Sequence, residues 1–549
     1  MRQRILPWGA LTTLCIAINV LFVLFPLLTL VGNSFSGADG GLGFDGLARF
    51  LANPDYLQGL RNTVVLGVAV TVAATLVGVP FAYIVARYDF PLKNVVALLP
   101  VATIIIPEVI TCQSWLLVLG NNGFVTKALR DSAGIELPSF YGWGGMIFVM
   151  TLVYYTYIYL STLAALRGFD GQLEEASRSL GRTPVETVFR VVIPTVAPAI
   201  LVNAMVVFTL VVGNFAVSII LGNRIPLLSI QTYNAFVNEM GGSPVMQSTL
   251  SLVMITLVAI VLFVQKRFVE RRLVQMAQGR APTAVRVASW RGMVFAGLVL
   301  VVVLLSFLPL VTVFVAAFTE SRGPLVRWGT FSLAGIERAL TAGVDPILNS
   351  LKFASVATAV GIAFAVVASY LIVKKRSAAT QALDYLVVLP LTISGTVLGI
   401  ALVQAFNSGS MALTGTALIM IVTYVVRRMP FSIRSAASSL YNIPDSLEEA
   451  SISLGVPPLK TFLKVVVPVM WASVASAFVL MWASTLSELS ASIVVYGGGL
   501  ETLPIAIFRQ VDSGRMGPAS AYAAVLVVLI VVPIALSVKL LRIRLFATK

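Results

Sequence analysis

The 549-residue sequence contains no histidine and only two cysteines, and just 11% of its residues are charged. The absence of histidine excludes imidazole metal ligands, imidazole general bases and histidine-based pH switching. Cys15 and Cys112 lie far apart in apolar runs, so neither a disulfide framework nor a thiolate metal cluster is indicated. No Gly-Lys pair occurs, which excludes the phosphate-binding loop of a nucleotide hydrolase. No cluster of catalytic residues is left to indicate an enzyme.

Hydrophobic residues, in contrast, make up 58% of the chain. Soluble domains carry about 25% charged residues, so this composition indicates an integral membrane protein. A spanning helix needs about 20 apolar residues, and the chain has room for about a dozen such helices. The net charge of +15 would suggest nucleic acid in a soluble protein. In a membrane protein it indicates basic loops on the cytoplasmic side, and no nucleic-acid partner is expected.

Apolar runs predict two sets of six spanning helices. The first set lies near residues 8–31, 63–85, 95–119, 146–166, 195–221 and 247–265. The second lies near residues 292–318, 350–373, 384–406, 411–427, 469–496 and 520–538. The N-terminal run is too long for a signal peptide and no cleavage site follows it, so we expect an uncleaved first span. With six spans each, both halves begin on the same side of the membrane, as parallel repeats do.

One polar segment between apolar runs occurs twice with the same internal spacing. Its landmark residues each recur 274 positions later: Glu175 and Glu449, Ala176 and Ala450, Gly181 and Gly455, Pro194 and Pro468. Helix-forming residues precede each Gly, which suits a left-handed turn at the end of a helix. A second short amphipathic segment leads from the Gly to the Pro, which is expected to open the next span. The pattern predicts a helix–turn–helix hairpin on the membrane surface, over residues 170–194 and again over 444–468.

An alternative interpretation of these hairpins is an amphipathic helix that only lies on lipid. Such helices are usually richer in Lys and Arg, whereas these carry paired acids and a protein-like apolar stripe. In the second copy, Asp445 or Ser446 is expected to cap the helix, and Ser446 with Glu449 fits a capping box. The composition favours a protein partner over a lipid surface.

The repeat divides the chain into two halves, residues 1–265 and 292–549, joined by a basic linker over 266–291. Most of the 38 Lys and Arg residues fall on the side of the membrane that holds both termini, both hairpins and the linker. Basic loops mark the cytoplasmic side. Both termini and both hairpins are therefore predicted to be cytoplasmic.

The hairpin sequence resembles the EAA loop of the membrane subunits of binding-protein-dependent ABC importers of the type I fold. The signature of that family is Glu-Ala-Ala, three residues, Gly, nine residues, and Ile-x-Leu-Pro. Here the spacing is intact, with substitutions in both copies: Ser177 and Ser451 in the third position, and Val191, Ile193, Val465 and Val467 in the aliphatic positions. The resemblance implies an all-α polytopic protein of about 12 transmembrane helices, built as two tandem six-helix permease halves. It also implies that each loop is a coupling helix in which the Glu contacts an ATPase subunit and the Gly makes the turn.

The same resemblance implies the partners. We expect two copies of a separate ABC ATPase subunit, which bind the ATP and magnesium, and a periplasmic or lipid-anchored substrate-binding protein. This chain then carries no cofactor and resides in the bacterial inner membrane, surrounded by lipid. Fused double permeases of this length resemble ferric-iron importers most closely, with thiamine and aminoethylphosphonate importers as neighbours. The segment 486–493 also looks like the ferric-importer version.

Three polar residues inside the predicted spans are candidates for the substrate pathway: Glu108, Glu488 and Asn214, which lies 274 positions before Glu488. Ionisable residues within spans are costly and mark functional sites by default. Carboxylates are hard oxygen ligands that would suit a hard cation. The alternative for either Glu is a protonated side chain, or one that bonds to backbone left unsatisfied by a nearby Pro.

A secondary transporter is the alternative from another class, since such proteins also contain parallel six-span halves. It predicts coupling charges within spans and a linker between halves. It does not predict a matched hairpin between the fourth and fifth span of each half. The two hairpins therefore favour the ABC importer.

Overall fold

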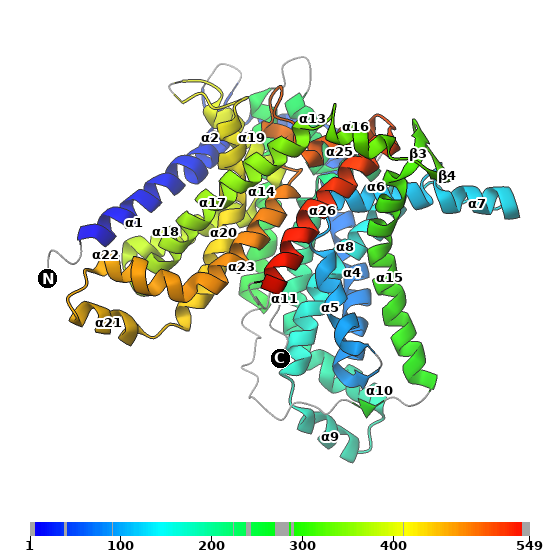
Figure 1. Cartoon of the computed structure of the whole chain (residues 1–549), viewed down its shortest axis with the longest axis horizontal. Helices are drawn as coiled ribbons and strands as arrows, with labels where there is room; N and C mark the ends of the chain where they lie inside the picture. The colour runs from blue at the N-terminus through cyan, green and yellow to red at the C-terminus, as the bar shows by residue number, and fades with distance from the viewer. Residues whose placement is uncertain are drawn as a thin grey trace. The chain divides into compact units, whose positions relative to one another are not determined.

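The computed structural model describes residues 6–37, 41–90, 92–222, 224–237, 243–269, 285–286, 290–409 and 411–540. The chain forms two compact units (Figure 1). Unit 1 comprises Met1–Ala52, Thr232–Leu252 and Ser332–Lys549, and unit 2 comprises Asn53–Gln231 and Val253–Phe331. Of the predicted linker, residues 270–284 and 287–289 lie outside the described residues.

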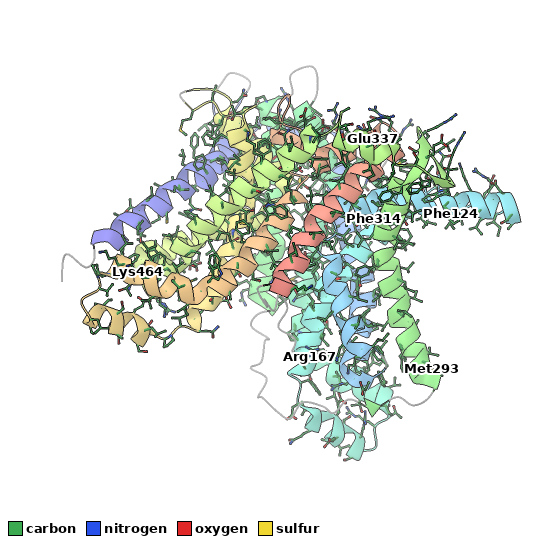
Figure 2. The ribbon with its side chains drawn as sticks, in the orientation of Figure 1. Phe124, Arg167, Met293, Phe314, Glu337 and Lys464 are labelled. Atoms are coloured by element: carbon green, nitrogen blue, oxygen red, sulfur yellow. The ribbon has the colours of Figure 1, made fainter. Side chains whose placement is uncertain are left out.

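The core of unit 2 consists of three helices that pack against one another: α4 (Pro54–Arg87), α8 (Trp143–Arg167) and α11 (Ile193–Val212). Helix α15 (Trp290–Ala317) packs against α5 (Lys93–Thr103) and α6 (Glu108–Leu119). In the sequence, α15 opens the second half. Unit 2 is thus completed by the first span of the other half. Figure 2 places Arg167 and Met293 at the same end of this unit, with Phe124 and Phe314 toward the opposite end.

Unit 1 repeats this arrangement with the halves exchanged. Its core consists of α17 (Asp345–Lys374), α20 (Ala417–Tyr441) and α23 (Val467–Leu486). The N-terminal span packs on the second half, with α1 (Leu6–Asn19) against α18 (Ala378–Val388) and α2 (Phe25–Ser34) against α19 (Gly395–Phe406). The first span of each sequence half therefore belongs to the compact unit built mainly from the other half.

Further elements complete both units. The helices are α3 (Asp45–Ala52), α7 (Phe124–Ala133), α12 (Ala216–Leu221), α13 (Leu228–Val237), α14 (Pro244–Val264), α16 (Ala334–Leu340), α24 (Ser492–Val495), α25 (Leu503–Asp512) and α26 (Met516–Leu540). Strand β1 (Tyr88–Asp89) pairs in parallel with β2 (Val285–Arg286), and β3 (Thr319–Arg322) pairs antiparallel with β4 (Leu325–Phe331).

The internal repeat extends to individual hydrogen bonds. In unit 2, Asn62 donates to the carbonyl of Pro226, and the Thr63 hydroxyl accepts the N–H of Leu228. In unit 1, the corresponding Asn349 donates to the carbonyls of Gly499 and Glu501, and Ser350 accepts the N–H of Leu503. The recurrence of the same contacts in both units confirms two tandem halves of one architecture.

Among the described residues, nine helices are long and apolar enough to cross a membrane, or eleven if each of two bent helix pairs counts as one span. The bent pairs are Lys93–Thr103 with Glu108–Ala133, at 104°, and Ala378–Thr392 with Gly395–Phe406, at 113°. The predicted continuous spans over 95–119 and 384–406 are therefore wrong. In the first, Pro107 has extended backbone; in the second, Ser394 caps the new helix by accepting the N–H of Val397 at 3.3 Å.

Helix α20 supplies a further element of spanning length, and it differs most from its prediction. A span over 411–427 was expected, but the helix runs from Ala417 to Tyr441. Arg427, Arg428 and Arg434, which the sequence pattern assigned to a cytoplasmic loop, therefore lie within the helix. The apolar run ended at the first Arg, whereas the helix continued because these Arg side chains find partners inside unit 1, described below.

Pro194 and Pro468 were expected to open spans, but each lies inside a longer helix, Pro184–Val212 and Pro458–Leu486. A five-residue π-helical turn lies before each Pro, with one residue between them: η3 (Val188–Val192) and η7 (Phe462–Val466). The same arrangement occurs at η2 (Val20–Leu24) before Pro26. Proline lacks the N–H of the regular ladder and its ring clashes with the carbonyl four residues earlier. The wider turn lets the helix pass through the Pro without ending.

Candidate functional site

The first hairpin consists of α9 (Gly171–Ser179) and α10 (Pro184–Thr187) in unit 2. Asp170 caps α9 by accepting the N–H of Gln172 at 3.0 Å. Gly181 follows with φ +83°, the left-handed conformation that a side chain disfavours. Thr183 and Glu186 then form a capping box at the start of α10. The start of each helix of this hairpin is thus fixed by local hydrogen bonds.

The second hairpin, α21 (Asp445–Ser453) and α22 (Pro458–Thr461), repeats the turn in unit 1. Gly455 has φ +85°, which confirms the predicted left-handed turn in both copies. The predicted cap was wrong, because the N-cap position is Pro444 and no side chain caps the helix. Asp445 instead accepts a hydrogen bond from Lys374 at 2.5 Å, which lowers the pKa of its carboxyl group. The start of this helix is held by another helix.

A hydroxyl pair joins the two limbs of each hairpin. Ser177 and Thr187 lie 3.0 Å apart in the first copy, and Ser451 and Thr461 lie 2.9 Å apart in the second. Each residue of the second pair lies 274 positions after its counterpart in the first. The Ser that departs from the Glu-Ala-Ala signature therefore has a structural role, since an Ala there could not form this bond.

The two adjacent acids at the start of each copy have different surroundings. Glu175 and Glu449 are exposed, whereas Glu174 and Glu448 are buried. Glu174 forms an ion pair with Arg87, the last residue of α4. The Arg87 guanidinium also lies 5.4 Å from the centroid of the Phe169 ring.

In unit 1, Glu448 accepts a hydrogen bond from Tyr370 at 2.7 Å and lies 3.6 Å from the Lys375 ammonium. Both partners lie at or just beyond the end of α17, which corresponds to α4. The buried acids thus attach the hairpins to equivalent helices. Sequence reasoning missed these anchors; the signal was a repeated Glu-Glu pair together with basic residues at the ends of α4 and α17, Arg87 and Lys375.

Each hairpin exposes four large apolar side chains among its polar ones. The exposed large apolar residues of the first copy are Leu173, Leu180, Val185 and Phe189. Those of the second are Leu447, Leu454, Leu459 and Leu463, each 274 positions later. The leucines beside the turn are the most exposed, with Leu180 at 82% and Leu454 at 86%. Exposed apolar patches mark interaction surfaces, and here the exposed apolar set, which we name the apolar face, recurs with its spacing intact.

Two of the predicted pathway residues meet in unit 2. Glu108 begins α6, Tyr154 lies on α8, and Asn214 lies in the break between α11 and α12. The Glu108 carboxylate accepts hydrogen bonds from Tyr154 and Asn214, both at 2.7 Å, and Asn214 also donates to the Tyr154 hydroxyl at 2.7 Å. We name Glu108, Tyr154 and Asn214 the first polar node. Tyr154 and Asn214 thus bring two other elements of unit 2 to the Glu108 carboxylate.

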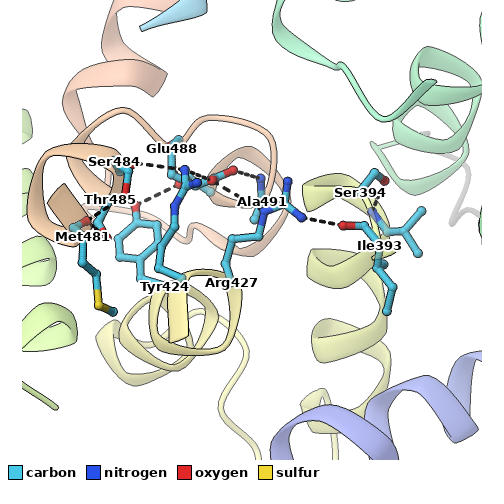
Figure 3. A network of polar contacts seen from close by, with 12 residues as sticks. Ile393, Ser394, Tyr424, Arg427, Met481, Ser484, Thr485, Glu488 and Ala491 are labelled. Carbon is cyan, nitrogen blue, oxygen red and sulfur yellow. Dashed lines mark hydrogen bonds and ion pairs between the residues drawn. The ribbon is translucent and has the colours of Figure 1, made fainter. Parts of the chain in front are cut away.

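Glu488 lies in unit 1, in the break between α23 and α24, and is 4% exposed (Figure 3). Its carboxylate lies 2.5 Å from Arg428 and 3.7 Å from Arg427, and it accepts the N–H of Ala491 at 3.2 Å. We name Arg427, Arg428 and Glu488 the second polar node. Glu488 was expected in the outer half of a continuous span, and its pairing with two guanidinium groups does not favour the predicted role as a ligand for a bare cation.

The two Arg side chains of the second polar node also serve the broken backbone. Arg428 donates to the carbonyl of Ser484 at 2.9 Å, near the end of α23, and Arg427 donates to the carbonyl of Ile393 at 2.5 Å, just before α19. Carbonyls at the end of a helix lack partners within it. The node therefore stabilises the helix break and the bent span together. Among the described residues, no group of three or more His, Cys, Asp and Glu side chains could hold a metal ion.

Comparison with known proteins places both halves in one family. The family described as "Binding-protein-dependent transport system inner membrane component" matches residues 78–275 and again 357–545, together more than half of the chain. A ferric transport system permease protein of Actinobacillus pleuropneumoniae is 24% identical over 95% of this chain and 76% of its own length. A probable ABC transporter permease protein of Sinorhizobium fredii is 26% identical over 99% of this chain and 97% of its own. A putative 2-aminoethylphosphonate transport system permease protein of Salmonella paratyphi A is 28% identical over 43% of this chain and 88% of its own.

Proposed function

Because this chain belongs to the family of binding-protein-dependent transport system inner membrane components, we propose that it is the permease subunit of an ATP-driven importer. In this proposal it receives a substrate from a periplasmic or lipid-anchored binding protein and passes it to the cytoplasm by alternating access. The chain is a multi-pass inner-membrane transport component and carries out no covalent chemistry on the substrate. Both termini and both hairpins face the cytoplasm.

The observation that carries the proposal is the pair of equivalent hairpins. Each presents an exposed carboxylate, Glu175 or Glu449, beside an exposed Leu and a left-handed Gly. Two equivalent surfaces suit two copies of one partner. Since the sequence has no phosphate-binding loop, the partner is a separate ABC ATPase subunit, which binds the ATP and magnesium while this chain binds no cofactor.

Force applied to a hairpin has a direct route into the membrane helices. The buried Glu174 connects the first hairpin to Arg87 on α4, and Glu448 connects the second to Tyr370 on α17. Each of these helices packs in the core of its unit. Closure of the ATPase dimer would therefore move the core helices of both units at once and switch the side of access.

Ferric iron is our first choice of substrate, because the ferric permease of A. pleuropneumoniae aligns with 95% of this chain. The same machine for aminoethylphosphonate, thiamine or another small solute is the alternative. The described residues contain no cluster of acids for a resident iron site, which suits a permease that passes its cargo on without storing it.

The proposal is tested by purifying the chain with its ATPase subunit and measuring the stoichiometry. We expect two ATPase subunits per permease chain. Glu175→Ala combined with Glu449→Ala should release the ATPase or leave its hydrolysis unresponsive to the permease. Glu337→Ala is the matched control, because that acid is also exposed but lies on α16, outside both hairpins. A single bound ATPase, or a double variant with full coupling, would refute the proposed role of the hairpins.

A further inference from the structure

The two polar nodes occupy matched places but differ in charge. Asn214 and Glu488 are 274 positions apart, as are Tyr154 on α8 and Arg428 on α20. Glu108 begins α6, whereas its counterpart α19 begins with Gly395, where an added Cβ would lie 3.1 Å from the Glu488 carboxylate. The carboxylate thus comes from the short helix in one unit and from the helix break in the other.

This exchange gives the second polar node two guanidinium groups for one carboxylate. The first node sets the Glu108 carboxylate against a hydroxyl and an amide. The second sets the guanidinium groups of Arg427 and Arg428 against the single carboxylate of Glu488. The three side chains of this node together carry one net positive charge.

The second polar node lies deep in its helix. Arg428 is near the middle of the 25 residues of α20, so a rise of 1.5 Å per residue places it roughly 16 Å from Ala417. A charge at the centre of a membrane helix is costly, and such charges face a protein interior or a water-filled cavity and mark substrate pathways. A purely structural tie would be cheaper with one Arg than with two.

The backbone around the second polar node also indicates access to water. Non-helical segments meet there, at Ile393–Ser394 and at residues 487–491. Irregular backbone at membrane depth is tolerated only where it is buried in protein or lines a water-filled cavity. Ser394, Ser487 and Ser490 are half-buried rather than sealed. The Nε atom of Arg428 is buried with no hydrogen-bond partner among the described residues, so a donor remains unused beside these segments.

We propose that the second polar node selects a negatively charged species, whose oxyanion groups meet Arg427 and Arg428 as it crosses the membrane. Guanidinium groups are well matched to carboxylate and phosphate oxygens. The inference rests on the proposed function as a permease. It deepens that function, because a ferric ion then crosses as a complex that oxyanion ligands make negative, and a phosphonate crosses as itself. A bare cation is repelled.

The test compares two engineered thiols at matched positions, Ser487→Cys beside the second polar node and Gly213→Cys beside the first. Both positions are half-buried and 274 residues apart, and the natural thiols Cys15 and Cys112 are buried, so background labelling is low. Each variant is reacted with an anionic and a cationic methanethiosulfonate reagent. A unit charge about 5 Å away in water changes the local concentration of each reagent about fourfold in opposite directions, so the anionic-to-cationic rate ratio should be about sixteenfold higher at Ser487→Cys.

Charge variants in the Ser487→Cys background separate electrostatics from shape. Arg427→Gln should abolish the preference and Arg427→Lys should keep it. Arg427→Gln combined with Glu488→Gln restores one net positive charge and should restore the preference. The proposal is overturned by equal ratios at both thiols, by a ratio that ignores these charges, or by a thiol that neither reagent reaches.

Competition then identifies the form of the anion. Slower labelling in inorganic phosphate indicates a free oxyanion, whereas slower labelling in ferric citrate but not in citrate indicates a complexed metal ion. Protection by neither would count against the proposal. The rates are measured without ATP or ATPase, so a failure of the node and a failure of the importer mechanism give different results.

Discussion

Replacing Glu174 by Ala should detach the first hairpin from its unit while leaving its outer surface unchanged. The Glu174 and Arg87 side chains are only 11% and 7% exposed. Removing one partner of a buried ion pair costs about 3–5 kcal/mol, because the remaining charge stays buried without compensation. The Phe169 ring continues to stabilise Arg87 by about 1–2 kcal/mol. We therefore expect the attachment to weaken by about 3 kcal/mol, the lower end of that range.

Hydrogen exchange measured by mass spectrometry on the purified, lipid-embedded protein reports this weakening directly. Since each 1.4 kcal/mol is a factor of ten, the amides of α9 should exchange about 100-fold faster. Glu175→Ala is the control, because its exposed carboxylate has no part in the attachment, and exchange should stay unchanged. Adding Arg87→Met to Glu174→Ala should recover most of the protection, since an apolar pair removes the buried charge.

The Glu174–Arg87 ion pair is not the attachment of α9 if Glu174→Ala changes the exchange rate less than about threefold, or if the control variant speeds exchange in α9 equally. It also fails if the double variant is no more protected than the single one. In transport, Glu174→Ala should keep the ATPase bound but uncouple hydrolysis from uptake. Glu175→Ala, by contrast, should weaken ATPase binding.

Three further predictions concern the hairpins. Gly181→Val should lower coupled ATPase activity, because a left-handed backbone costs a residue with a branched side chain about 1–2 kcal/mol. Gly181→Asn should be tolerated, since Asn adopts this conformation more readily. Equal activity of the two variants would contradict the left-handed turn at Gly181. Phe189→Ser with Leu463→Ser should weaken ATPase capture in a pull-down without changing the thermal unfolding of the permease, and an unchanged capture would remove the apolar face from the interface. The Asp445 carboxylate bonds to Lys374, and its lowered pKa means that this bond stabilises the second hairpin at pH values above the ordinary 3.8 and is lost as the pH falls below that value. Hydrogen exchange in α21, corrected for intrinsic rates, should therefore be constant from about pH 8 to 5. A loss of protection within that window would contradict the assignment.

The sequence allowed the hairpins to be predicted because their determinants are local. A Gly that directly follows a helix-forming segment predicts a left-handed turn, and the observed φ values of +83° and +85° agree with it. The spacing from this Gly to the Pro is likewise a local feature of the sequence. The anchors were not predictable in this way. The pairing of Glu174 with Arg87 joins residues far apart in the chain, and only the packing of α4 beside the hairpin brings them together.

Hydropathy also failed where tertiary contacts decided the outcome. Arg427 and Arg428 ended an apolar run, yet α20 continues through them. Their side chains pair with the Glu488 carboxylate and donate hydrogen bonds to two backbone carbonyls. The bends before Glu108 and Gly395 lie inside apolar runs, which carry no signal for a change of direction. The exchange of first spans between the units likewise depends on packing, which a count of spans does not contain.

The most direct test of the account is uptake into proteoliposomes that contain the permease, its ATPase subunit and its binding protein. Labelled ferric iron, thiamine and aminoethylphosphonate are offered in parallel, with and without ATP, to the natural chain and to the Glu175→Ala/Glu449→Ala variant. The account predicts uptake that requires ATP, favours ferric iron, and is lost in the variant. Uptake that proceeds equally without ATP, or that is unchanged in the variant, would contradict it.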